Sequence, residues 1–126
     1  LPQVGHRLQR IDAGGKRIID DSFNGNLEGM LEGINICAHH EGRKVIITPG
    51  LVESTDEANI LLAESINEKF DLAIITGSLN SKLLQNNISE EKIVILTDKS
   101  KMQDTIAQLT KAGDLIYFAN DAPNFI

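Results

Sequence analysis

The densest group of polar side chains in this sequence is the segment Asp20-Asp21-Ser22-Phe23-Asn24-Gly25-Asn26. It follows an apolar run typical of a strand and precedes the first turn of an amphipathic helix. A carboxylate there can accept hydrogen bonds from the two hydroxyls of a ribose, and the amides of a helix N-terminus attract anions. Because Glu28 in that first turn opposes a phosphate, the pattern favours the sugar end of a nucleotide. The same residues also cap helices and shape turns, and local pattern alone favours this structural role.

Two common phosphate-binding motifs are absent from the sequence. Gly14-Gly15-Lys16 resembles the end of a Walker loop, but Arg17 follows in place of a hydroxyl residue and no glycine stands five positions before Gly15. No Gly-x-Gly-x-x-Gly dinucleotide fingerprint occurs either. We therefore predict a hairpin turn at residues 13–15, and we expect any triphosphate to be held elsewhere.

Other reactive side chains give weaker signals. His39 and His40 lie near the end of the first predicted helix, where neighbouring positions point about 100° apart and share no metal geometry; a cation favoured by the helix dipole is the better interpretation. Cys37 has no second cysteine and no obvious base beside it, so we predict a buried, inert thiol. The segment containing Asn120 and Asp121 follows the last predicted strand and is expected at the same rim as Asp21, although its local pattern alone indicates only a polar loop. We predict no catalytic residue and no metal site in this chain.

Composition limits the class of protein. The chain has 126 residues, with 12 Lys+Arg against 18 Asp+Glu, a net charge of −6 and 41% hydrophobic residues. This is enough for one domain with its own core. An acidic chain with 4% aromatic residues does not suit general nucleic-acid binding, and no apolar run reaches the roughly 18 to 20 residues of a membrane span. One cysteine and no signal-like segment favour the cytoplasm.

These polar residues must be positioned by alternating strands and helices. We expect strands at residues 7–12, 16–20, 44–48, 72–76, 93–96 and 115–118, and helices at 27–41, 54–70, 80–85 and 99–111. Asn26 is the expected N-cap of the first helix and Gly42 its stop. The predicted inward positions are Leu27, Met30, Leu31, Ile34 and Ala38 in the first helix, Ala58, Leu61, Leu62, Ser65 and Ile66 in the second, and Met102, Ile106 and Leu109 in the last.

This alternation predicts the fold class. We expect an α/β, Rossmann-like three-layer domain with a mostly parallel sheet of about six strands, an N-terminal β-hairpin and helices on both faces. Functional loops should follow the carboxyl ends of the strands. Only residues 1–6 look like a connecting segment.

Three features together resemble the C-terminal domain of the Mur ligases. They are His6-Arg7 before the first strand, the segment 20–26 opening a helix, and the loop Thr48-Pro49-Gly50-Leu51-Val52-Glu53. The double-Asp form of the segment resembles members that join D-alanyl-D-alanine to UDP-N-acetylmuramoyl-tripeptide. Several residues depart from that pattern: Phe23 replaces a usual Tyr, Leu27 a common Pro, and Ala119-Asn120-Asp121 a frequent Lys-Gly-Ser.

The resemblance implies a function. The whole enzyme would be cytoplasmic and ATP-dependent, and it would use an acyl phosphate. Its N-terminal and central domains lie outside this chain, and the central domain would hold the Walker loop and most of the ATP and Mg²⁺. Residues 1–126 would be a lid, inactive alone. Arg7 would contact the nucleotide, Asp21 would bond the ribose hydroxyls from a solvent-filled crevice, Asn24 and Asn26 would shape the loop facing the cleft, and Asn120 and Asp121 would help hold the amino substrate.

Two alternatives remain open. One is a non-catalytic α/β interaction or regulatory module, and the other is the equivalent domain of a folate or cyanophycin type of ligase. The first differs in class from a ligase, whereas the second differs only in the amino substrate.

Overall fold

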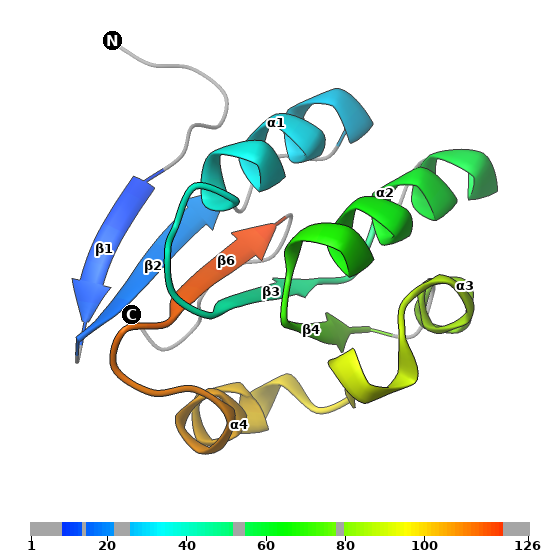
Figure 1. Cartoon of the computed structure of the whole chain (residues 1–126). Coiled ribbons are helices and arrows are strands. Elements are labelled where there is room, and N and C mark those ends of the chain that lie inside the picture. Colours follow the sequence, from blue (N-terminus) through cyan, green and yellow to red (C-terminus); the bar gives the residue numbers. More distant parts are fainter. Residues whose placement is uncertain (1–8, 14, 22–25, 52–54, 78–79, 120–126) are drawn as a thin grey trace, which may run out of the picture.

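The computed structural model describes residues 9–13, 15–21, 26–51, 55–77 and 80–119. Within them, strands and helices alternate along the chain, as Figure 1 shows. The strands are β1 (Gln9–Ala13), β2 (Lys16–Asp21), β3 (Lys44–Thr48), β4 (Leu72–Thr76), β5 (Ile93–Leu96) and β6 (Leu115–Ala119). The α-helices are α1 (Leu27–Cys37), α2 (Asp56–Lys69), α3 (Ser81–Asn87) and α4 (Met102–Leu109), with short 3₁₀ turns η1 (Glu90–Lys92) and η2 (Lys99–Lys101).

The strands form one sheet in the order β1-β2-β6-β3-β4-β5. β1 pairs antiparallel with β2, and every other neighbouring pair is parallel. The predicted α/β class with an N-terminal hairpin is therefore confirmed. Gly15 makes the hairpin turn with φ +79°, and a Cβ there would lie 2.9 Å from the Ala112 Cβ, so glycine is required on two counts.

Two cores separate the helices from the sheet. One lies beneath α1 and α2 and contains Ile46, Phe70 and Tyr117; the other lies beneath α4 and contains Ile47 and Phe118. In Figure 1, α1 and α2 cover one face of the sheet and α4 covers the other. The central strands β4 and β6 are buried along their whole length, which explains why their sequences are continuous apolar runs.

The first helix is shorter than predicted. Asn26 caps α1 as expected, since its side chain accepts a hydrogen bond of 2.7 Å from the Gly29 amide. The helix ends at Cys37 instead of continuing to Gly42. The Ala38 amide still makes a helical bond to the Ile34 carbonyl, but the amides of His39 and His40 bond only three residues back, to the carbonyls of Ile36 and Cys37. The two histidines therefore lie in the α1–β3 loop and not on a helix.

Other predicted inward positions need correction. The buried residues of α2 are Asn59, Leu62, Ala63 and Ile66, an i, i+3, i+4, i+7 stripe, whereas Leu61 is 51% exposed. The predicted helix at 99–111 begins as η2 and ends as α4 at Leu109. There the Thr110 hydroxyl donates to the Ile106 carbonyl at 2.6 Å. β5 is only partly buried because it lies at the sheet edge.

No helix in the described ranges is both long and apolar enough to cross a membrane.

The cysteine in α1 provides a probe of this core. Cys37 is buried, as predicted. Burial, with a smaller contribution from the Asp21 carboxylate and against an opposing effect of Lys44, raises the pKa of its thiol from an ordinary 9.0 to about 12. Such a thiol is neither accessible nor ionised near neutral pH.

We predict that Cys37 reacts with a thiol-specific disulfide reagent only when the chain unfolds. The rate in increasing urea should follow the unfolded fraction measured by circular dichroism. Because the native pKa is raised, the native state is favoured below pH 9.0 and loses this contribution as pH rises towards about 12. Rapid stoichiometric labelling of the native chain at pH 8 would contradict the burial of Cys37.

Candidate functional site

The predicted site lies where β2, β3 and β4 end at one edge of the sheet. Their last residues are Asp21, Thr48 and Thr76, and each of these is at most 2% exposed. Gly50 and Gly77, with φ of +85° and +73°, turn the chain just beyond β3 and β4. This is the edge at which open α/β sheets place ligands. The side chains of these three last residues are nevertheless all buried.

The Asp21 carboxylate is buried, and the expectation that it faces a solvent-filled crevice is wrong. The residue is 1% exposed, and its Oδ2 accepts a hydrogen bond of 2.6 Å from the Tyr117 hydroxyl on β6. The reason is strand alternation: β2 extends to Asp21, one residue further than predicted, so that Asp21 shares the face of Ile19, which α1 covers. The carboxylate thus anchors the end of β2 to β6.

A glycine in α1 makes this contact sterically feasible. A Cβ at Gly33 would overlap the Tyr117 hydroxyl, and it would lie 2.8 Å from Tyr117 Cζ and 3.2 Å from Asp21 Oδ2. The other side of the tyrosine ring is fixed by Phe70, whose ring stacks on it at 6.2 Å between centroids and an interplanar angle of 11°. The hydroxyl is therefore held between a helix backbone and a strand end.

The remaining predicted site residues divide into two groups. Asn26 is described, and its side-chain oxygen is engaged as the N-cap of α1, the structural role that the local sequence pattern favoured. Arg7, Asn24, Asn120 and Asp121 lie outside the described residues. Of the six residues predicted to bind ligands, the structure therefore places two, Asp21 and Asn26, at the two ends of the segment that connects β2 to α1.

The β3–α2 loop is held by a residue that sequence reasoning missed. Asn59 is 1% exposed; its Oδ1 accepts from the Leu51 amide at 2.8 Å, and its Nδ2 donates to the carbonyls of Leu51 and Thr55 at 3.0 and 3.2 Å. The Asn80 amide also donates to the Leu51 carbonyl at 3.3 Å. An asparagine on the inward stripe of a helix was the available signal, because a buried amide needs partners.

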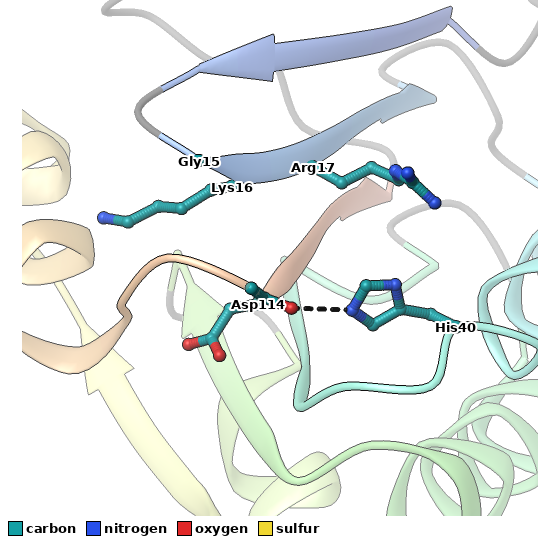
Figure 2. A pocket seen from close by; sticks show the side chains of 6 residues that line it. Gly15, Lys16, Arg17, His40 and Asp114 are labelled. Atoms are coloured by element: carbon teal, nitrogen blue, oxygen red, sulfur yellow. Dashed lines mark hydrogen bonds between the residues drawn. The ribbon is translucent and has the colours of Figure 1, made fainter.

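A second feature lies at the opposite, amino edge of the sheet. A cavity of about 310 Å³ opens where β2 and β6 begin, and Figure 2 shows the side chains around it. The His40 Nε2 atom lies 2.9 Å from the Gly113 carbonyl oxygen. The cavity is lined by Gly15, Lys16, Arg17, His40, Gly113 and Asp114.

Neither edge contains metal-binding geometry among the described residues, which hold no cluster of three His, Cys, Asp or Glu side chains suited to a metal. The described residues at the carboxyl edge do not fit a nucleotide either. Asp21 is buried beneath α1, and the Asn26 oxygen is used within the helix cap. A ribose would have to be held by other residues.

Comparisons with known proteins identify the fold. No protein-family model matches the sequence, and a search of curated proteins gives no match. MurF ligase from Thermotoga maritima, solved in complex with ADP, matches with a TM-score of 0.76 and 24% identity, over 96% of this chain and 28% of MurF. Two others among the solved structures that match this chain come from different ligases.

One is a domain from a Haemophilus ducreyi protein named as a UDP-N-acetylmuramate:L-alanyl-γ-D-glutamyl-diaminopimelate ligase. Its TM-score is 0.68 at 15% identity, over 92% of this chain and 89% of that domain. The other is a bifunctional folylpolyglutamate synthase/dihydrofolate synthase from Yersinia pestis, with a TM-score of 0.69 at 14% identity, over 94% of this chain and 29% of that enzyme.

These likenesses define the class of domain. The chain has the α/β fold of Mur ligase C-terminal domains, as its sequence pattern predicted. It spans 28% of the length of MurF. At identities below 25%, the likeness defines the architecture alone.

We predict that Tyr117→Phe lowers the free energy of unfolding by about 1 to 3 kcal/mol, because it removes the donor that a buried carboxylate uses. In the Asp21→Asn background the same substitution should cost less, since the amide is not charged. Urea denaturation of the wild type, both single variants and the double variant measures the coupling.

Additive costs in that cycle would show that the hydroxyl and the carboxylate do not stabilise each other. Ile95→Val, a conservative change at an exposed position of the edge strand, is the control and should alter stability by no more than a few tenths of a kcal/mol.

Proposed function

We propose that this chain is the C-terminal domain of a cytoplasmic ATP-dependent, amide-forming ligase of the Mur type. The whole protein would join D-alanyl-D-alanine to UDP-N-acetylmuramoyl-tripeptide through an acyl phosphate. One observation carries the proposal: the segment 20–26, with its double-Asp pattern, connects β2 to α1 at the carboxyl edge of a sheet with the Mur fold. MurF, which shares this fold, was solved with ADP.

In this proposal the domain closes the ATP site and does not hold the nucleotide by itself. Asp21 acts as an anchor: its bond to Tyr117 fixes where the segment leaves β2, and the Asn26 cap fixes where the segment enters α1. Asn59 fixes the neighbouring β3–α2 loop in the same manner. Fixed loop ends lower the entropic cost of presenting loop residues to a ligand.

The contacts to ligands would then come from residues beyond those the structure describes. Arg7 and Asn24 remain the predicted nucleotide contacts, and Asn120 and Asp121 the predicted contacts to the amino substrate. Residues 1–6 would end the hinge to a central domain that holds the Walker loop and Mg²⁺. The partners of this domain would be the N-terminal and central domains of the same protein.

Two other functions are compatible with the same fold. The folylpolyglutamate synthase/dihydrofolate synthase has the same fold, so a ligase with a folate substrate would use the same architecture. The double-Asp pattern of residues 20–26 favours the D-alanyl-D-alanine substrate over that one. A non-catalytic module is the alternative from another class, and it would bind a partner or a small nucleotide without the rest of a ligase.

We predict that the 126-residue chain binds Mg-ATP more weakly than about 1 mM. The described carboxyl edge offers no exposed ligand set for a nucleotide, and a few contacts do not offset the entropic cost of association. Isothermal titration calorimetry measures this directly. Micromolar binding would contradict the proposed lid and would favour a self-contained nucleotide-binding module.

We predict that the full reading frame releases phosphate from ATP only when both UDP-N-acetylmuramoyl-tripeptide and D-alanyl-D-alanine are present. A panel containing dihydropteroate with glutamate tests the folate alternative, and turnover of that pair alone would overturn the substrate assignment. Asp121→Ala should raise the KM for the dipeptide and leave the KM for ATP unchanged. Exposed Asp104→Ala on α4 is the matched control, with no expected change.

A further inference from the structure

The cavity at the amino edge of the sheet has a predominantly basic lining. Lys16 and Arg17 come from β2, and His40 comes from the α1–β3 loop. The acid that lines it, Asp114, is 2% exposed and already neutralised, because its Oδ2 accepts from Arg43 Nη1 at 3.3 Å and from the Lys111 amide at 2.9 Å. Basic groups therefore gather here although the whole chain carries a net charge of −6.

The backbone holds this cavity in one shape. Arg17 N donates to the Asp114 carbonyl at 3.0 Å, and Gly113 N donates to the Gly15 carbonyl at 2.9 Å. These bonds tie the hairpin turn to the start of β6. Gly42 is needed beside them, because a Cβ there would lie 2.6 Å from the Gly113 oxygen and 2.9 Å from His40 Nε2. His40 is thus placed against two glycines, Gly42 and Gly113.

The hydrogen bond of His40 fixes the chemistry of its ring. A carbonyl oxygen only accepts, so Nε2 carries the proton in the 2.9 Å contact with Gly113. The other nitrogen, Nδ1, is then a lone pair in the neutral ring and becomes a donor only when the ring takes up a second proton. An anion at Nδ1 therefore requires the charged ring.

Figure 2 shows how the side chains are directed. The Asp114 carboxylate points away from the imidazole, whereas Lys16 and Arg17 extend in opposite directions from β2, with Arg17 directed to the side on which His40 lies. A guanidinium group has five N–H donors, so Arg17 can contact an anion and keep its existing protein contacts.

We propose that this cavity is a binding site for a small phosphate-bearing anion, held by Arg17 and by His40 in its protonated form, while Lys16, which extends the other way from β2, adds positive charge nearby without contacting the anion. A volume of about 310 Å³ is far larger than the roughly 30 Å³ of one water molecule and reaches the lower end of small-ligand pockets. The site lies at the opposite end of the strands from the proposed ligase cleft and does not depend on that function.

The charged groups around His40 come from several elements. The Lys44 ammonium group donates to the His40 carbonyl at 3.2 Å, and Arg43 pairs with Asp114 across the same edge. The described charged and titratable groups on the elements around His40 are Lys16, Arg17, His39, Glu41, Arg43, Lys44, Asp71 and Asp114. A bound dianion adds two negative charges beside the ring and favours its protonated form.

Sulfate titration followed by ¹H–¹⁵N NMR tests the proposal. Sulfate stays a dianion between about pH 5.5 and pH 8, so any pH dependence of binding comes from the protein. At low ionic strength, we expect saturable chemical-shift changes at residues 15–17, 40 and 113–114. The affinity for sulfate should be about tenfold higher at about pH 5.5 than at about pH 8, because the protonated His40 ring donates one charged hydrogen bond to the anion. The absence of saturable shifts there, or shifts elsewhere only, would overturn the site.

His40→Gln separates charge from geometry, because its amide can still donate to the Gly113 carbonyl but cannot take up a proton. We expect it to remove the tenfold difference between the two pH values, whereas His39→Gln, an exposed neighbour that does not line the cavity, should retain it. An unchanged pH dependence in His40→Gln would refute the role of the ring. Lys16→Gln, at a half-buried position in the hairpin, should weaken binding similarly at both pH values and provides a second variant.

Discussion

The Tyr117 hydroxyl meets the Asp21 carboxylate at the place where α1 approaches the sheet without a side chain. This bond joins residues 96 positions apart in sequence. It constrains three elements together: β2 must continue to Asp21, β6 must present a tyrosine and not an aliphatic residue, and α1 must carry glycine at position 33. A buried carboxylate without a donor is costly, so each of these choices depends on the other two.

The contact between Tyr117 and Asp21 matters for the whole sheet because Tyr117 lies on β6, a central strand. β6 is the last of the described strands in sequence, yet it lies between β2 and β3 and pairs in parallel with both. The sheet therefore cannot be completed until residues 115–119 are in place, and a long loop must close first. Tyr117 and Phe118 then contribute to the cores on the two faces, so that one strand joins both layers.

The sequence allowed most of the fold to be predicted and much less of the site. Apolar runs such as Leu72–Thr76 and Leu115–Ala119 report burial on both faces, and the Asn26 cap marks the start of α1, because these signals are local. The direction of the Asp21 side chain depends on whether β2 continues to Asp21, because inside the strand the alternation of side chains places Asp21 on the same face as Ile19, whereas a residue beyond the strand end is not bound by that alternation.

Other features depended on tertiary partners. Leu61 is 51% exposed because it lines an open groove between α1 and α2 on the outer side of these helices. The role of Asn59 becomes evident only once the Leu51 loop is seen beside it. The cavity beside His40 brings together residues from three separate segments, and no spacing in the sequence relates Lys16 to Gly113. The two edges of the sheet are joined by β6, which is buried along its whole length and packs against a core on each face. Energetic coupling between distant sites requires an element with two arrangements, and close packing on both faces resists a second arrangement, so we expect an anion at the amino edge and a ligand at the carboxyl edge to bind independently.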